Sequence, residues 1–579
     1  EGQPFYNNLF HALALAAGDP DASFPLDVMK GVPLGVSSPV LEDPGIWPTK
    51  VELGEIPSTE EPDLPTTAAN YPSAVRFKED IEATFLVERE LGMVSGPLTY
   101  DEAALLCQCE VKDLCVGAMA AIDEGDKIRT IFDATVIMVN EWIRLNMRKK
   151  TTAPGLHDLL WARKVLFRKG RRLTLFKSDV SKAHRRIKVR PCDWKYMVAE
   201  INGSLWVNHV GTYGVASAQY YWGRMASLMI RCLYQISDLF LWIMVYVDDF
   251  MVILDESQGP AGSAMFLLFL SAVGCPVSWH KNALDAYNLW LGYEVDINTA
   301  LAFIPPCKKL VILPILNKFI SGSSFSPEDL ASALGRLQWM VKAYPIANPF
   351  LQPLYSWQKV VTRPSTPGEL VRCMAVLLKR FLHIDNVQIF KDEELTLSYG
   401  ASDAGASDEY ATIGGWWASE PNPSKSDVKW FAYRLFQADA PWLFKKNSAK
   451  RKVSAAELLG SLVLTVLMSK DLGPTKADIK VSLKTDNLGN SYAASKLSSN
   501  KWPNSALLME LSILQYTTGI RATVDHIKRD FNQWADQLTH LDFSGFSLQN
   551  RRCPQWEDLP PWILFDDLLS LYKDIHVIS

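Results

Sequence analysis

Two adjacent aspartates interrupt an apolar stretch near the middle of the chain. Asp248 and Asp249 stand inside the run Leu241–Leu254, which reads LWIMVYVDDFMVIL. Burying two like charges side by side is costly unless a cation neutralises them, and a divalent metal with oxygen ligands is a common solution. The flanking Val, Ile, Tyr and Phe residues predict two strands with the aspartates at the tip of a hairpin. A surface turn is the alternative, because Asp is frequent in turns.

A third carboxylate and two cations precede this pair. Asp179 ends the strand-like run Leu173–Asp179, 69 residues before Asp248. Three carboxylates on neighbouring strands could hold two metal ions about 3.5–4 Å apart, an arrangement that serves in-line phosphoryl transfer. Lys127 and Arg129 alternate along a predicted strand and would meet a triphosphate as cations. Exposed strand residues are the alternative interpretation of these two side chains.

These motifs resemble those of retroelement reverse transcriptases, and further on Leu334-Gly-Arg-Leu-Gln-Trp339 and Pro349-Phe-Leu-Gln-Pro-Leu-Tyr355 resemble the connection segment of gypsy-like and DIRS-like retrotransposons. The resemblance to reverse transcriptases rests on Tyr246-Val-Asp-Asp249, Asp179-Val-Ser-Lys-Ala-His184, Lys127-Ile-Arg129, Gly211-Thr-Tyr-Gly-Val-Ala-Ser-Ala218, Lys281 and Leu291-Gly-Tyr293. It implies that Asp179, Asp248 and Asp249 bind two metal ions. A backbone oxygen of Val180 would complete the second metal site.

The same resemblance implies a nucleotide site and a primer site. The residues expected at the incoming nucleotide are Lys127, Arg129, Val180, Ala183, His184, Tyr213 and Gly214. Those expected at the primer and template are Lys281, Leu291, Gly292 and Tyr293. The family commonly has Tyr or Phe at the position of His184, where the side chain blocks a ribose 2′-hydroxyl. Imidazole is smaller and polar, so this departure puts the discrimination against ribonucleotides in doubt.

A second set of acids lies downstream. Asp403 ends a strand-like run, Glu457 lies near the start of a predicted helix, Asp486 follows a strand, and Asp536 opens a last helix. An acid near a helix start is favoured by the helix dipole whatever its function. The order of the four acids resembles the ribonuclease H domain of retroelements, which implies two metal ions and hydrolysis of the RNA strand of a hybrid. His540 is a candidate proton carrier, with an ordinary surface histidine as the alternative.

The resemblance implies an α+β right-hand polymerase, a helical connection and an α/β ribonuclease H-like domain. Residues 1–75 are acidic and rich in Pro, Gly and Ser, which predicts a partly disordered leader. The predicted parts are the leader 1–75, fingers and palm 76–305, thumb or connection 306–394, ribonuclease H 395–545 and a C-terminal tail 546–579.

Charge is distributed unevenly along the chain, although the net charge is only −5. Residues 1–126 hold 23 acidic and 6 basic side chains, and residues 127–190 hold 18 basic and 4 acidic ones. A basic block inside an acidic protein indicates a nucleic-acid partner, with a solvated helical face as the alternative. The nine scattered cysteines lack zinc spacing and indicate a reducing compartment, cytoplasmic or nuclear. The apolar run 228–254 contains charges, so we expect no membrane span.

We therefore expect a retroelement enzyme that is an RNA-directed and DNA-directed DNA polymerase with ribonuclease H activity. The resemblance implies Mg²⁺, or Mn²⁺, with two ions in each active site. Its implied partners are an RNA template, a DNA primer, an RNA–DNA hybrid and deoxynucleoside triphosphates. The alternatives are an RNA-dependent RNA polymerase, which would have no hybrid to hydrolyse, and a domesticated or decayed RNA-binding scaffold, which would be expected to lose some carboxylates.

Overall fold

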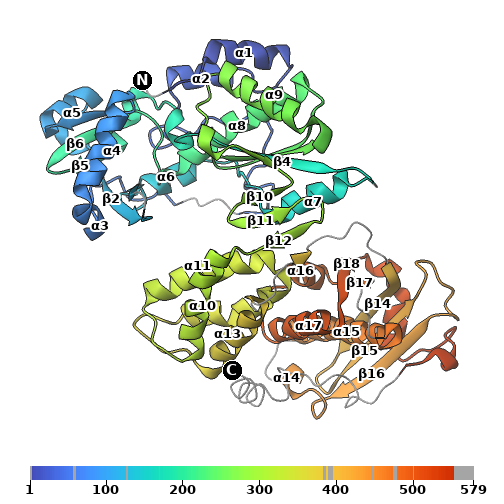
Figure 1. The fold of residues 1–579 in the computed structure, drawn as a ribbon. Helices are drawn as coiled ribbons and strands as arrows, with labels where there is room; N and C mark the ends of the chain where they lie inside the picture. The colour runs from blue at the N-terminus through green and yellow to red at the C-terminus, as the bar shows by residue number, and fades with distance from the viewer. Residues whose placement is uncertain are drawn as a thin grey trace. The chain divides into compact units, whose positions relative to one another are not determined.

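The structure is a computed structural model that divides into two compact units. It describes residues 3–55, 60–125, 128–168, 170–382, 387–388, 396–444, 449–473, 479–499 and 501–552. The first unit comprises residues 1–291 and 296–299, and the second comprises residues 292–295 and 300–579. Both units contain helices and strands, so the predicted α+β class is confirmed (Figure 1).

The core of the first unit is a four-stranded antiparallel sheet. Its strands follow the order β7 (Phe240–Tyr246), β8 (Asp249–Asp255), β4 (Leu173–Asp179) and β9 (Ala283–Asp285). Helices α8 (Ala216–Ile236) and α9 (Gly259–Ala272) pack against it. Phe266 of α9 meets the rings of Phe176 and Phe250 at 5.7 and 5.3 Å. A Cβ on Gly262 would lie 2.6 Å from Leu254, so this glycine permits the close approach of α9.

A second, five-stranded sheet of this unit is surrounded by shorter helices. Its order is β1 (Val94–Leu98), β6 (Ser204–Asn208), β5 (Val198–Ile201), β2 (Val116–Asp123) and β3 (Ile128–Asp133). Strands β5 and β6 form a hairpin around Asn202 and Gly203, with positive φ at both turn residues. The remaining helices are α3 (Pro72–Arg76), α4 (Lys78–Glu90), α5 (Tyr100–Cys107), α6 (Val139–Asn146) and α7 (Leu156–Leu166).

The prediction of a disordered leader is wrong for residues 3–55. Helices α1 (Asn7–Ala16) and α2 (Phe24–Lys30) are part of the first unit's core, where Phe10 and Phe24 are fully buried. Asp21 accepts two hydrogen bonds from the buried guanidinium of Arg224 in α8, at 2.6 and 2.7 Å. The acidic composition indicated a solvated chain, but several of these acids form ion pairs inside the fold.

The second unit combines a helical part with a mixed sheet. The sheet order is β16 (Lys429–Phe436), β15 (Tyr410–Ala418), β14 (Thr396–Ala406), β17 (Ile479–Thr485) and β18 (Ile520–His526). The first three strands are antiparallel, and β14, β17 and β18 are parallel. The helices are α10 (Pro306–Ile320), α11 (Pro327–Ala343), α12 (Gln352–Gln358), α13 (Glu369–Leu382), α14 (Pro441–Phe444), α15 (Ala449–Leu472), α16 (Leu488–Lys496), α17 (Asn504–Thr518) and α18 (Gln533–Thr539). Short strands β10 (Tyr287–Trp290), β11 (Tyr293–Asp296), β12 (Leu301–Phe303) and β13 (Val387–Gln388) precede or connect these parts.

Direct contacts join the helical part of the second unit to its mixed sheet layer. The Ser512 hydroxyl of α17 donates to the Ile346 carbonyl, and the Asn348 amide donates to the Lys496 carbonyl at 3.0 Å. The predicted ranges 306–394 and 395–545 therefore share one compact unit. The predicted tail, 546–579, lies mostly outside the described residues.

Helix α15 is the central helix of the second unit. It packs on β14 and β15, and Gly460 lies so close to β14 that a Cβ there would be 3.5 Å from the Asp403 carbonyl. Its segment Arg451–Leu472 is long and apolar enough to cross a membrane by length and composition, and 78% of its most apolar window is buried inside the protein. Such burial is typical of a core helix, and it fixes Glu457 over the end of β14.

Two candidate carboxylate sites

The first site lies at one end of the sheet β7–β8–β4–β9. Asp179 is the last residue of β4 and pairs in register with Asp249, the first residue of β8. Asp248 occupies the turn between β7 and β8, where Val247 has φ of 57°. The Val180 N–H donates to the Asp248 carbonyl at 2.9 Å, which ties the end of β4 to this turn. The hairpin predicted for the two aspartates is thus present, with Asp179 beside it.

Two lysines contact the carboxylates of the first site. Lys281 Nζ donates to Asp179 Oδ2 at 2.8 Å, and Lys177 Nζ lies 3.5 Å from Asp249 Oδ2. Burial raises the pKa of Asp249 to about 6 despite the opposing charge of Lys177. Burial and the neighbouring charge of Asp179 also raise the pKa of Asp248. The carboxylates therefore repel one another and favour a bound cation.

The three carboxylates of the first site do not form one compact ligand group. Among the described residues, only one set of three acidic, His or Cys side chains has ligand atoms within 4.8 Å of one another, and it lies in the second unit. The lysine contacts explain the difference, because they draw Asp179 and Asp249 towards separate ammonium groups. Asp249 Oδ1 is nevertheless buried without a hydrogen-bond partner in the described structure, which leaves one oxygen suited to a divalent cation.

Two of the residues expected at the nucleotide, His184 and Tyr213, lie next to each other, and burial together with the nearby charge of Asp248 raises the pKa of Tyr213. The rings of His184 and Tyr213 lie 5.5 Å apart. Burial lowers the pKa of His184 to about 4, so its imidazole is neutral at pH 7. Gly214 has φ of 101°, and a Cβ there would lie 1.9 Å from the Phe132 carbonyl oxygen, so only glycine fits. Ala183, in the same short turn as His184, is buried.

A buried ion-pair network supports this turn, and the sequence analysis missed it. Glu88 of α4 is 5% exposed and accepts from Lys182 Nζ at 2.8 Å and from the Arg185 guanidinium. Arg185 also donates to Asn208 Oδ1 at 2.6 Å. The sequence could have predicted the burial of Glu88, because it lies on the same helical face as the apolar residues Ile81 and Phe85 of α4. A glutamate at such a position requires a cationic partner.

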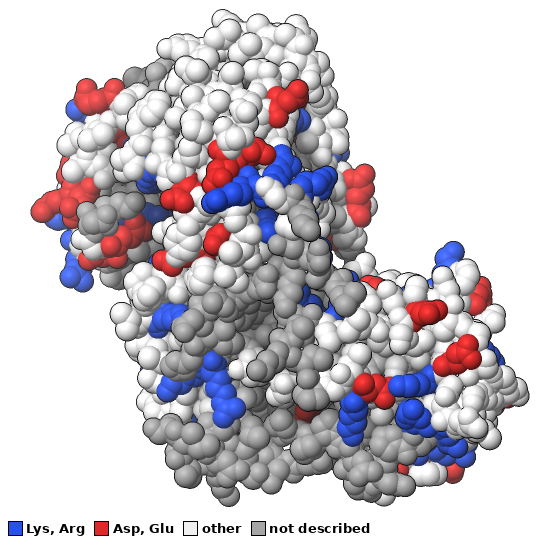
Figure 2. Space-filling model, turned by 45° about the vertical axis from the view of Figure 1, so that its right-hand side comes forward, with Lys and Arg blue, Asp and Glu red and all other residues white. Residues whose placement is uncertain are grey.

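Of the two cations that were predicted to bind the triphosphate, the structure describes only Arg129. Lys127 lies outside the described residues. Arg129 is exposed on β3 and pairs with Glu124 at 3.0 Å, while its charge opposes the rise in the pKa of Asp248 that burial causes. Other cations of the basic segment are also paired with acids of the N-terminal segment, as in Arg148–Glu42 and Lys150–Glu55. Figure 2 shows basic and acidic side chains interspersed on the face that it presents.

The four residues predicted at the primer and template fall in both units. Lys281 and Leu291 belong to the first unit, and Gly292 and Tyr293 belong to the second. Tyr293 is 1% exposed, stacks on Trp339 with ring centroids 4.5 Å apart, and donates its hydroxyl to the Trp339 carbonyl at 2.6 Å. These contacts give Tyr293 a packing role inside the second unit.

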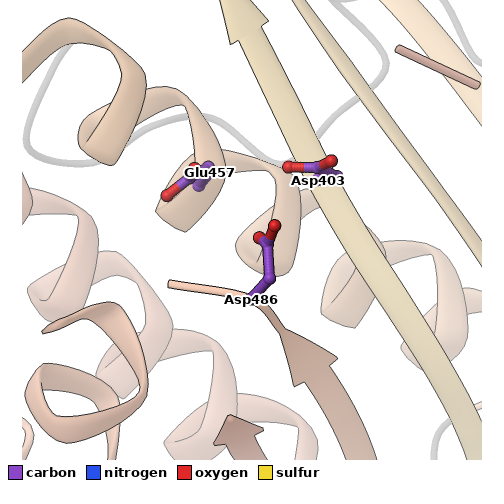
Figure 3. Close-up of side chains that lie close together, drawn as sticks. All are labelled: Asp403, Glu457 and Asp486. Carbon is purple, nitrogen blue, oxygen red and sulfur yellow. The ribbon is translucent and has the colours of Figure 1, made fainter. Parts of the chain in front are cut away.

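The second site brings three of its four predicted acids together. Asp403 on β14, Glu457 on α15 and Asp486 after β17 have ligand oxygens within 4.8 Å of one another. Figure 3 shows their carboxylates converging from a strand, a helix and a strand end. The prediction that Asp403 ends its strand is wrong, because β14 continues to Ala406. The parallel pairing of β14 with β17 brings Asp403 beside Asp486, which follows the end of β17. Helix α15 packs on β14 and adds Glu457.

Burial has the largest effect on the pKa values of the second site, and repulsion between its acids adds to it. Burial raises the pKa of Asp403 to about 7, and the charge of Asp486 adds to this rise. Burial also raises the pKa of Glu457 to about 7, with Asp486 again contributing and a hydrogen bond from Asn487 opposing. Asp486 Oδ1 is buried and lacks a hydrogen-bond partner among the described residues. Clustered, partly unsatisfied carboxylate oxygens fit a divalent cation with hard oxygen preference.

Asp536 and His540 lie at the margin of this site. Asp536 opens α18, and its charge contributes to the raised pKa of Asp403. It is half-buried, lies 3.6 Å from Arg529 and 3.7 Å from His540, and does not belong to the group of three. The His540 imidazole is mostly exposed, so it is accessible to solvent and to a polar ligand.

Comparisons with known proteins give structural neighbours only. No protein-family model matches the sequence, and no curated protein sequence matches it. The foamy viral protease-reverse transcriptase dRH in complex with double-stranded DNA is 16% identical, with a TM-score of 0.44 over 80% of this chain and 72% of that chain. The foamy viral protease-reverse transcriptase with an RNA/DNA hybrid is 15% identical, with a TM-score of 0.44 over 81% and 56%. Its complex with double-stranded DNA is 14% identical, with a TM-score of 0.43 over 87% and 92%.

Proposed function

We propose that this chain is a retroelement enzyme with two nucleic-acid sites, an RNA-directed DNA polymerase in the first unit and a ribonuclease H in the second. The observation that supports it best is the convergence of Asp403, Glu457 and Asp486 from strand, helix and strand. The register pairing of Asp179 with Asp249, next to Asp248 in the turn, supports the polymerase site. The proposed partners are an RNA template, a DNA primer, an RNA–DNA hybrid and deoxynucleoside triphosphates.

In the second site, Asp403, Glu457 and Asp486 would hold Mg²⁺ or Mn²⁺, with Asp536 at the margin. A bound divalent cation supplies an activated water and charge stabilisation for phosphodiester hydrolysis. The chain itself orients the acids, because α15 fixes Glu457, β14 fixes Asp403 and the end of β17 fixes Asp486. The exposed His540 imidazole is placed to exchange a proton with a leaving group or with solvent.

In the first site, Asp179, Asp248 and Asp249 would hold the divalent cation. Such a cation orients a triphosphate for in-line attack by a primer hydroxyl. Lys281 holds one oxygen of Asp179, and Lys177 faces Asp249, where its charge opposes the rise in the pKa of Asp249 that burial causes. The neutral His184 and the Tyr213 ring would line the nucleotide side, and Arg129 would face the triphosphate.

The test is primer extension by the full chain on an RNA template with Mg²⁺, comparing deoxynucleotides with ribonucleotides. We expect extension with deoxynucleotides, together with cleavage of the RNA strand of a labelled hybrid. Extension with ribonucleotides alone would indicate an RNA polymerase and contradict the proposal. Hybrid binding without either activity, with Mg²⁺ and with Mn²⁺, would instead support a non-catalytic scaffold.

A further inference from the structure

The Glu457 carboxylate is hydrogen-bonded through one of its two oxygens. The side-chain amides of Asn487 and Asn490 both donate to Oε2, the second at 3.3 Å. The same carboxylate belongs to the group of three with Asp403 and Asp486, which Figure 3 shows beside it. Two donors on Oε2 occupy the lone pairs of that oxygen and leave Oε1 available to a ligand.

The amide of Asn490 cannot rotate without losing several contacts. Its Nδ2 also donates to the Ser454 carbonyl at 2.8 Å, and its Oδ1 lies 3.1 Å from Ser454 Oγ and 3.2 Å from Asn504 Nδ2. Asn490 is 2% exposed, so no solvent replaces these bonds. Every donor and acceptor position of this amide is used, which fixes the N–H that points at Glu457.

The side chain of Asn487 is held in place because it also caps a helix. It is the N-cap of α16, and its Oδ1 accepts from the Asn490 N–H at 3.0 Å. An N-cap side chain has one preferred orientation, so its Nδ2 must point away from the helix, where Glu457 lies. The two amides therefore hold Glu457 Oε2 from two rigid positions on one helix start.

We propose that Asn487 and Asn490 are positioning residues that make Glu457 a one-oxygen metal ligand and so select Mg²⁺ or Mn²⁺ over Ca²⁺. Mg²⁺ requires a compact octahedral shell, whereas Ca²⁺ accepts more oxygens, including both oxygens of one carboxylate. Holding Oε2 away from the metal favours the smaller ion. This inference rests on the proposed metal site of the second unit and adds its ion selectivity.

The test is calorimetric titration of the full chain with Mg²⁺ and with Ca²⁺, in an Asp248→Asn background that weakens binding at the first site. The variant Asn487→Ser removes the amide donor and keeps a good helix N-cap. Loss of an outer contact to a metal ligand typically changes metal affinity about tenfold, so we expect the preference for Mg²⁺ over Ca²⁺ to fall about tenfold. An unchanged preference would overturn the inference.

Two further variants separate selectivity from folding. Asn348→Ala removes an exposed amide of the same unit, bonded to the Lys496 carbonyl, and we expect an unchanged ion preference. Asn490→Ala removes the second donor and should shift the preference in the same direction as Asn487→Ser. If Asn487→Ser and Asn490→Ala have the melting temperature of the parent and retain its preference for Mg²⁺ over Ca²⁺, Asn487 and Asn490 have no role in selectivity. If the parent itself binds neither ion at the second site, the proposed ribonuclease function fails first.

Discussion

Glu88 shows how a single residue type at a core position determines local structure in this protein. Its carboxylate is buried between Lys182 and Arg185, next to the turn that contains His184. Burial alone would raise its pKa, but the charges of Arg185 and Lys182 outweigh burial and lower it. A carboxyl with a lowered folded-state pKa stabilises the protein above its unfolded-state pKa, and this stabilisation is lost as the pH falls through the folded value.

The variant Glu88→Gln should therefore destabilise the first unit at pH 7. It leaves the buried Arg185 guanidinium and the partly exposed Lys182 ammonium without their carboxylate, and breaking a buried pair costs about 3–5 kcal/mol. Urea unfolding at pH 7 and at pH 4 measures this. The loss should be smaller at pH 4, because the carboxyl of the unfolded state, with its ordinary pKa of 4.5, takes up protons there more readily than the folded one, which reduces the stability that Glu88 provides. Glu90→Gln, in an exposed pair on the same helix, is the control. Equal stability of both variants would contradict the role of Glu88.

Metal binding at the second site should release protons near neutral pH. The pKa values of Asp403 and Glu457 are raised to about 7, so both groups are partly protonated at pH 7 and must ionise to bind a cation. Without metal, the raised pKa of Asp403 means that stability falls as pH rises from 3.8 towards 7. Mg²⁺ should therefore raise the melting temperature more at pH 8 than at pH 6. An equal shift at both pH values would show that these carboxyls are not the ligands.

The sequence motifs and their resemblance to a known family predicted the acids of both sites but not the side chains that surround them. Asp403 lies on a strand, Glu457 lies on a helix and Asp486 follows a strand, so local secondary structure largely determines their positions. Lys177 and Asn490 could not be assigned in this way, because their partners, Asp249 and Glu457, lie on other elements. Only the tertiary pairing of β4 with β8, and of α16 with α15, brings them together.

At the scale of elements, helices α1 and α2 make the predicted leader part of the first unit. Phe24 stacks on Tyr221 with ring centroids 6.2 Å apart and lies under the Arg224 guanidinium, 4.1 Å from the ring centre. Helix α8, which contains Tyr221 and Arg224, begins directly after the predicted nucleotide-site residues Tyr213 and Gly214. The N-terminal helices therefore support the helix that follows the first site. The amino-acid composition did not reveal this packing of α1 and α2, because Pro and acidic residues are also typical of disordered segments.

Phe24→Ala should unfold the first unit more easily. Truncating a fully buried phenylalanine removes its apolar contacts and leaves a cavity, at a cost of about 3–5 kcal/mol. Thermal melting and protease sensitivity of residues 3–55 measure the effect. Leu15→Ala on α1 is the matched control, because Leu15 is 63% exposed and its truncation should change stability by less than about 0.5 kcal/mol. If Phe24→Ala left the melting temperature unchanged, the structural role of α2 would be contradicted and residues 3–55 would be a dispensable leader.

At the scale of the whole molecule, the uneven charge of the sequence is partly neutralised inside the first unit. Acids of the N-terminal region pair with cations of the basic segment or of α8, as in Glu42–Arg148, Glu55–Lys150 and Asp19–Arg231. The basic block therefore overstated the surface that is available to a nucleic acid, because some of its cations are already paired with acids. Linear charge counts cannot foresee this, because they ignore which segments pack together.

Each unit contains one carboxylate site, so the two proposed activities should be separable by single substitutions. The decisive measurement compares Asp248→Asn and Asp486→Asn in the full chain, assaying primer extension on RNA and cleavage of a labelled RNA–DNA hybrid with Mg²⁺. The account predicts that Asp248→Asn abolishes extension and retains cleavage, whereas Asp486→Asn retains extension and abolishes cleavage. If both substitutions left both wild-type activities unchanged, the assignment of the two sites would be contradicted.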